Sequence, residues 1–116
     1  MIVRGELTAA DAYRLHQLHK PVVVLIRSAS ASASGLKRLM SCALLMRRHQ
    51  YVFVLRRTLM RDKKIAHTLN RVRRMKNVFF GVIEDEDNPK NIQQRRLRLY
   101  DRLVRDARCA ASELAV

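Results

Sequence analysis

Two kinds of hydrophobic pattern follow one another in regular order along the chain. Three continuous apolar runs, rich in β-branched residues, predict buried strands at about 21–26, 50–55 and 77–83. Apolar residues spaced three and four positions apart predict helices at about 9–19, 35–48, 64–75 and 89–113. The expected order is helix, strand, helix, strand, helix, strand and helix, with a compact β-α-β-α-β unit in the middle.

Residues with strong local preferences lie at the ends of several predicted elements. Thr8 and Asp11 have the spacing of a capping box, and Pro21 ends the first helix. Asn88 followed by Pro89 is the preferred order at a helix start. Gly81 lies inside the third strand, which indicates a bulge or a close approach by another backbone.

Apolar stripes predict how two of the helices pack. The face of helix 35–48 that we expect to be core consists of Leu36, Leu39, Met40, Ala43 and Leu44. If so, Leu44→Ala costs roughly 2–5 kcal/mol. The stripe of the last helix can dock on its own domain or on a neighbouring protein, and consists of Ile92, Leu99, Leu103, Ala107, Ala110 and Leu114.

Positive charge is concentrated in the middle of the chain. The 116 residues include 24 Lys and Arg against 10 Asp and Glu, a formal net charge of +14 at pH 7. Such a protein repels itself and is expected to bind a polyanion, either nucleic acid or an anionic membrane surface. Fourteen basic residues and a single acidic one, Asp62, lie between Arg27 and Lys76. This excess does not fit a plain solvated face, so we expect the segment to bind nucleic acid.

Several classes of function lack their characteristic residues. No apolar run is long enough to span a membrane, and the N-terminus does not have the pattern of a secretory signal. His16 and His19 are three positions apart on a helix, but no Cys or acidic cluster completes a metal site, so no metal is predicted. No catalytic constellation and no cofactor site is recognised in the sequence. The protein is therefore not expected to be an enzyme. A phosphoryl-handling enzyme would need a glycine-rich turn that three scattered glycines cannot supply. His49 and His67 are expected to contact RNA or solvent.

Short motifs in the middle of the chain resemble a known family. The segment Val24-Leu-Ile-Arg-Ser28, a small-residue loop, and a basic helix with Leu44-Leu-Met-Arg-Arg48 resemble large-subunit ribosomal protein thirty, the universal L-thirty family. Thr58 and the stretch Leu69-Asn-Arg-Val72 occupy further family positions, and Val78–Glu84 matches the last strand. The resemblance covers about residues 22–84.

The sequence also departs from the family pattern. Ser30-Ala31 replaces an Ile-Gly pair, and Leu45 replaces the signature glycine. The proline expected after Thr58 is Leu59, and the Arg-Gly-Met of the second turn is not kept in Met60–Lys64. These changes indicate a divergent and extended member.

The order of the elements predicts an α+β fold with helices on one face of the sheet. Together with the resemblance, the expected core is β-α-β-α-β, made of a three-stranded antiparallel sheet and two helices on one face, related to the ferredoxin-like fold. Residues 1–20 and 85–116 are expected to be N- and C-terminal helical extensions of an RNA-binding domain at 21–84.

The implied function is that of a structural constituent of the large ribosomal subunit. The terminal extensions favour a mitochondrial ribosome over one in the bacterial cytoplasm or a plastid. The expected partners are large-subunit rRNA and, through the terminal helices, neighbouring ribosomal proteins, without membrane insertion or a homo-oligomer. A free-standing RNA-binding assembly or maturation factor is the alternative.

The residues expected to bind RNA lie at loops and helix ends, where their side chains can reach phosphates. They are Arg27, Ser28, Lys37, Arg38, Arg47, Arg48, Arg56, Arg57, Thr58, Arg61, Lys63, Lys64, Asn70 and Arg71.

Overall fold

Strands and helices alternate along the whole chain. The computed structural model describes residues 2–3, 5–26, 32–83 and 89–114, and within the last helix the side chains of 94–110. The elements are β1 (Ile2–Val3), α1 (Ala9–Gln17), β2 (Val23–Ile26), α2 (Ala33–Leu45), β3 (Gln50–Arg56), the 3-10 helix η1 (Arg57–Arg61), α3 (Lys63–Val72), β4 (Val78–Ile83) and α4 (Pro89–Leu114). The predicted helices and the three long strands are therefore found close to their expected positions.

Within the described residues, the sheet has four strands in the order β1-β2-β3-β4, and every neighbouring pair is parallel. The expectation of a three-stranded antiparallel sheet is therefore wrong. A helix lies between each strand and the next, and it returns the chain to the same end of the sheet, so that successive strands run in the same direction. The continuous apolar runs of the sequence are typical of parallel strands buried on both faces. β1 is only two residues long, too short to leave a pattern in the sequence.

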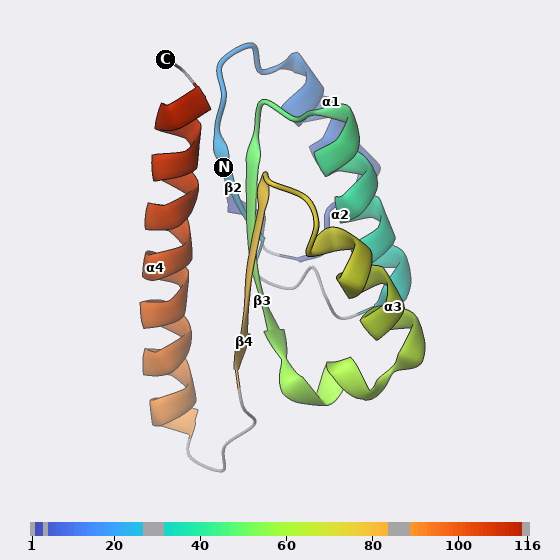
Figure 1. Ribbon diagram of the computed structural model, residues 1–116, viewed down its shortest axis with the longest axis vertical. Coiled ribbons are helices and arrows are strands. Elements are labelled where there is room, and N and C mark those ends of the chain that lie inside the picture. The colour runs from blue at the N-terminus through green and yellow to red at the C-terminus, as the bar shows by residue number, and fades with distance from the viewer. Residues whose placement is uncertain (1, 4, 27–31, 84–88, 115–116) are drawn as a thin grey trace.

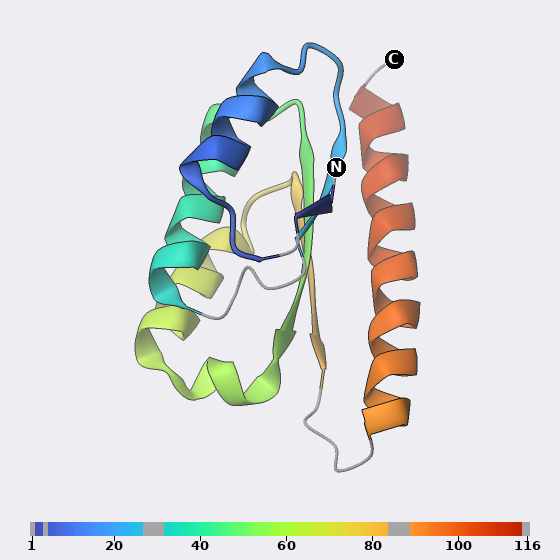
Figure 2. The same ribbon diagram turned by 180° about the vertical axis from the view of Figure 1, so that it is seen from behind.

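Helices cover both faces of the sheet. Among the described elements, Figures 1 and 2 show α1, α2 and α3 on one face and α4 along the other. Alternate residues of β3 enter two separate cores: Tyr51 and Phe53 pack under α1–α3, whereas Val52 and Val54 pack under α4. The described part of the apolar stripe of α4 thus docks on the sheet of its own chain, where Tyr100, Leu103 and Ala107 are buried.

The helix starts follow local capping chemistry. The predicted capping box of α1 is confirmed, since the Thr8 hydroxyl accepts a hydrogen bond from the backbone of Asp11, whose carboxylate accepts one from the backbone of Thr8. Ser32 caps α2 by accepting a hydrogen bond from the Gly35 backbone nitrogen at 3.1 Å, so this helix begins at Ala33, within the segment expected to be a small-residue loop. Asp62 caps α3 in the same manner.

Three local expectations are corrected by the tertiary packing. Leu44 is 49% exposed, because the buried side of α2 consists of Leu36, Leu39, Cys42 and Ala43. His49 is fully buried, so it contacts neither RNA nor solvent. Gly81 keeps continuous register with Val54 and forms no bulge. Its close neighbour is the side chain of Leu99 in α4, where a Cβ atom would lie 2.6 Å from a methyl carbon.

Candidate nucleic-acid interface

One side of α3 carries a stripe of polar and basic residues. Ile65, Thr68, Leu69 and Val72 form the buried side of this helix. The opposite side recurs at the same three- and four-residue spacing and is exposed throughout. We call it the α3 basic face; it consists of Lys63, Lys64, His67, Asn70, Arg71 and, just beyond the helix end, Arg74.

The α3 basic face has a single acidic neighbour in sequence, and that residue is used by the helix itself. Between residues 32 and 83 the chain has 13 Lys and Arg and one acidic residue, Asp62. The Asp62 carboxylate accepts a hydrogen bond from the Lys64 backbone nitrogen at 2.9 Å. A carboxylate at this position satisfies an otherwise unpaired N–H and complements the helix dipole. The negative charge of Asp62 balances the partial positive charge at the start of α3, while the charged groups of the lysines and arginines extend into solvent.

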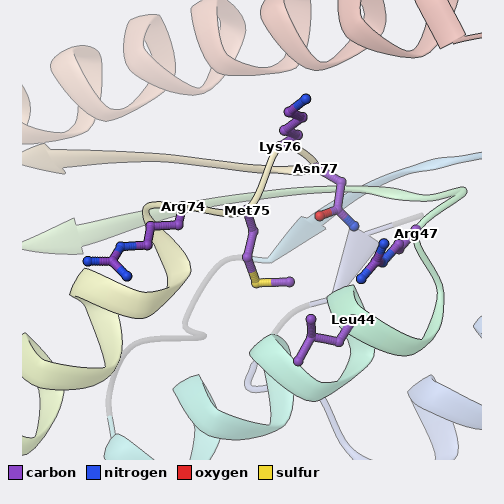
Figure 3. A pocket seen from close by; sticks show the side chains of 6 residues that line it. All are labelled: Leu44, Arg47, Arg74, Met75, Lys76 and Asn77. Carbon is purple, nitrogen blue, oxygen red and sulfur yellow. The ribbon is translucent and has the colours of Figure 1, made fainter.

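A hollow lies where the α3 basic face reaches the amino edge of the sheet. Its volume is about 430 Å³, and its lining residues are Leu44, Arg47, Arg74, Met75, Lys76 and Asn77. Figure 3 shows the thioether of Met75 and the side chain of Leu44 at its floor, with the Arg47 guanidinium turned toward the same space. Arg74 and Lys76 project outward at its rim. The hollow thus combines an apolar floor with cations, which suits an anionic group on a partly apolar ligand.

The buried side chain of Asn77 holds the elements around this hollow together. Its amide nitrogen donates to the carbonyl oxygen of Ala43 at 3.0 Å and to that of His49 at 3.3 Å. The start of β4 is therefore fixed to the last turn of α2 and to the start of β3. Both donor hydrogens face the protein, and Figure 3 shows the amide oxygen on the side of Met75.

The hydrogen bonds of His49 fix its tautomer. Its Nδ1 accepts from the Val22 backbone nitrogen at 3.1 Å, so Nε2 carries the hydrogen and donates to the Leu15 carbonyl at 2.9 Å. Burial lowers the pKa of His49, with the nearby charge of Arg48 acting in the same direction. Both effects keep the ring neutral, and it serves as a structural link between α1, β2 and β3.

Tyr51 lies beside this link and is also structural. Its hydroxyl donates to the carbonyls of Cys42 and Met46, at 3.3 and 3.4 Å, at the end of α2. Burial raises the pKa of Tyr51 above its ordinary value of 10, so the phenol stays protonated. Burial likewise raises the pKa of the Cys42 thiol, which does not suit a nucleophile.

The residues predicted to bind RNA divide between the two edges of the sheet. Arg56 ends β3 at the carboxyl edge, and the exposed residues of η1 follow it there. Arg47 lies at the opposite edge, beyond the end of α2. The seven residues of β3 separate these edges by about 23 Å. The predicted set that the structure places at or near the carboxyl edge is Lys37, Arg38, Arg56, Arg57, Thr58, Arg61, Lys63 and Lys64. The α3 basic face connects the two groups.

Two of the predicted residues hold the fold together. The Arg48 guanidinium donates to the carbonyls of Leu15 and Leu18, at 3.1 Å in both cases, and thereby caps the end of α1. Arg38 donates to the Leu7 carbonyl at 3.0 Å. These two guanidinium groups are already bound to backbone oxygens. Arg27 and Ser28 lie outside the described residues.

Sequence reasoning missed two cations of the hollow, Arg74 and Lys76. The signal for Arg74 was present, because it continues the spacing of His67, Asn70 and Arg71. For Lys76 no periodic signal exists, since it follows the end of α3, and only the packing of α2 against the α3–β4 connection places it beside Arg47.

Three further observations bear on the class of protein. No described helix is both long and apolar enough to cross a membrane. Across residues 2–3, 5–26, 32–83 and 89–114, no three His, Cys, Asp or Glu side chains gather in a way that could hold a metal ion. No protein-family model, no curated protein and no solved structure matches the chain.

Proposed function

We propose that this protein binds RNA through the α3 basic face and the adjoining hollow. The observation that carries the proposal is the position of the cations: they recur along the solvent side of one helix, directly opposite its buried side. The acidic residue next to them is occupied in capping the helix. Cations held on a rigid helix bind phosphates by displacing condensed counterions, and this requires no particular base sequence.

Polar groups between the cations favour RNA over DNA. His67 and Asn70 lie on the same exposed face as Lys63 and Arg71. Their side chains can hydrogen-bond a ribose 2′-hydroxyl, which DNA lacks, while the neighbouring cations contact phosphates. Aromatic residues make up only 5% of the chain, so stacking on unpaired bases is a minor contribution. These features suit a folded RNA with double-helical regions.

An anionic membrane surface fits this arrangement less well. A peripheral amphipathic helix inserts its apolar side into the lipid interface while its basic side faces the headgroups. The apolar side of α3 is part of the protein core, where Ile65, Leu69 and Val72 are each at most 2% exposed. The helix therefore has no apolar side left for lipid.

The test compares two variants that remove the same charge from different surfaces. The first is Lys63→Gln/Lys64→Gln/Arg71→Gln, on the α3 basic face. The matched control is Arg98→Gln/Arg102→Gln/Arg105→Gln, on exposed positions of α4. Glutamine preserves helix propensity in both cases. Binding to a fluorescent RNA hairpin is measured by anisotropy over a range of salt concentrations.

We expect the α3 variant to bind more weakly and with a shallower dependence on salt. Each lost phosphate contact reduces the slope of log K against log salt by about 0.7–0.9, so three lost contacts reduce it by roughly 2–3. The α4 variant should keep nearly the original slope. Equal changes in both variants would show that net charge alone drives binding and would refute the α3 interface. A DNA hairpin of the same sequence that bound equally well would count against the choice of RNA.

Membership of a large ribosomal subunit is a finer proposal that rests on the resemblance within residues 22–84. The parallel sheet differs from the antiparallel one that this resemblance implied, so the RNA-binding proposal is argued from the charged surface alone. Sedimentation of a tagged protein from cell or organelle lysate tests the finer proposal. A ribosomal constituent remains with the large subunit at high salt, whereas an assembly or maturation factor dissociates. For a mitochondrial ribosomal protein, the large subunit that carries it is found in the mitochondrial fraction.

A further inference from the structure

The open edge of the sheet at β4 has the properties of a self-association site. β4 pairs with β3 along all six of its residues and is the last of the strands that the structure describes. Figure 1 views the sheet nearly edge-on from this side, and no described helix or strand lies in front of β4. The sequence of the strand, Val-Phe-Phe-Gly-Val-Ile, contains neither a charge nor a proline. Proteins normally protect exposed edges with such residues, with bulges or with a covering element.

The hydrogen bonds between β3 and β4 determine which backbone groups of β4 point toward the open edge. The Tyr51 nitrogen donates to the Asn77 carbonyl at 2.9 Å, so Asn77 points its backbone groups toward β3. Because successive residues of a strand alternate, Val78, Phe80 and Val82 direct theirs away from β3, toward the open edge. The Val78 nitrogen donates within its own chain, to Met75. The groups available for pairing are the N–H and C=O of Phe80 and Val82 and the C=O of Val78.

We infer that a second copy of this chain occupies this edge, with the two β4 strands antiparallel about a twofold axis. Phe80 of one copy then lies opposite Phe80 of the other, and Val82 lies opposite Val78. In this register the backbone N–H and C=O groups that point toward the open edge of one copy face those of the other copy, so the edge is complementary to itself. A twofold pairing also covers both open β4 edges at once and closes the assembly as a dimer.

The distribution of charge favours the antiparallel arrangement over a parallel one. Arg73, Arg74 and Lys76 precede β4 and are exposed. Antiparallel pairing puts the two sets of cations at opposite ends of a six-residue strand, about 20 Å apart, which exceeds the screening length of about 8 Å at physiological salt. In sequence, Ile83 is followed directly by Glu-Asp-Glu-Asp.

The side chains at this edge are already apolar and ordered. Phe80 stacks on Phe53 with ring centroids 5.5 Å apart, and the Arg73 guanidinium lies 6.0 Å from the centroid of the Phe80 ring. Phe79, Phe80 and Val82 remain half-buried in one chain. Pairing would bury their remaining surface with little ordering cost. No homo-oligomer was expected from the sequence, whereas this edge is an uncharged strip between separated charges.

Proline substitution tests the inference without disrupting the native ladder. The Val82 N–H points away from β3, so Val82→Pro removes a donor of the intermolecular pairing and none of the β3–β4 bonds. Val82→Thr is the matched control, since it keeps the N–H and the β-branched shape. The mass of each full-length protein is measured by sedimentation equilibrium after nuclease treatment, so that RNA cannot bridge two copies.

We expect the native chain and Val82→Thr to reach twice the 13.5 kDa of one chain at micromolar concentration, and Val82→Pro to remain at 13.5 kDa. Amide exchange by NMR provides a readout on the native chain that does not depend on the proline variant folding. Protection of the Phe80 and Val82 amides should rise with protein concentration. A native chain that stays monomeric over the whole range, concentration-independent exchange, or a folded Val82→Pro that still dimerises would overturn the inference. A dimer that forms normally in the α3 charge variant separates this result from the RNA-binding proposal.

Discussion

The close contact between Gly81 and α4 predicts that Gly81→Ala destabilises the native chain but stabilises a variant that lacks the Leu99 side chain. A Cβ atom added at residue 81 would lie 2.6 to 2.8 Å from three side-chain carbons of Leu99. Ordinary contact between carbon atoms begins near 3.5 Å, so Gly81→Ala forces Leu99 or the whole of α4 to move by nearly 1 Å. Overpacking of this kind costs about 1–3 kcal/mol.

A second effect of Gly81→Ala acts in the opposite direction. Alanine loses less conformational entropy than glycine when it enters a strand, which is worth roughly 0.5–1 kcal/mol. The native background should therefore lose about 0.5–2 kcal/mol in total, or a few °C in Tm for a chain of this size. In the Leu99→Ala background the obstructing carbons are gone. There, Gly81→Ala should stabilise the protein by roughly 0.5–1 kcal/mol.

The assay is a double-mutant cycle by urea denaturation of the native chain, the two single variants and the double variant. The coupling free energy between the two sites is expected to be about 1–3 kcal/mol, since the overpacking exists only when both larger side chains are present. A change of equal size and sign in both backgrounds would refute the close packing of α4 on Gly81. It would also mean that α4 is not seated on the sheet as Figures 1 and 2 show.

Two further predictions concern the core beneath α1–α3. Leu39→Ala should lower the free energy of unfolding by roughly 2–5 kcal/mol, because Leu39 is fully buried. Leu44→Ala on the same helix should lower it by about 0.5 kcal/mol, because Leu44 is 49% exposed. Urea denaturation measures both values, and equal losses would contradict this orientation of α2. Because burial lowers the pKa of His49, the unfolded chain binds more protons than the folded one below the ordinary His pKa of 6.5. The stability of the native chain should therefore be retained above pH 6.5 and should fall as the pH decreases toward the pKa of His49 in the folded protein. Over that pH interval the Tm of His49→Gln should fall less than the Tm of the native chain. Identical pH profiles of Tm for the two proteins would refute the assignment of this pH dependence to His49.

Much of the local structure was predictable because the sequence repeats at the periods of helices and strands. The apolar run 50–55 and the three- and four-residue spacing around Leu69 gave β3 and α3 within one or two residues, except that α3 ends about three residues earlier than expected. The capping box at Thr8 depends only on residues three positions apart and was also correct. The concentration of positive charge before Lys76 is likewise a property of the sequence alone.

The hydrophobic period of a strand does not give its direction, because that period is the same whether its neighbour is parallel or antiparallel. The continuous apolar runs and the helix predicted between successive strands did indicate a parallel sheet, but the prediction did not follow that signal. The short motifs that resemble a ribosomal family suggested an antiparallel sheet, yet the two-residue β1 and the helix between each pair of strands produce a parallel one. Local motifs can therefore agree with a family while the overall strand arrangement does not.

The chain's sequence by itself determined where helices and strands form and where positive charge accumulates, because these depend on residues close together in the chain. Only the tertiary structure decided which cations are available to a ligand. Arg38 and Arg48 bind carbonyl groups about thirty positions away, whereas Lys63 and Arg71 extend into solvent. A side chain's role depends on which distant backbone groups need a partner, and that is fixed only when the elements pack together.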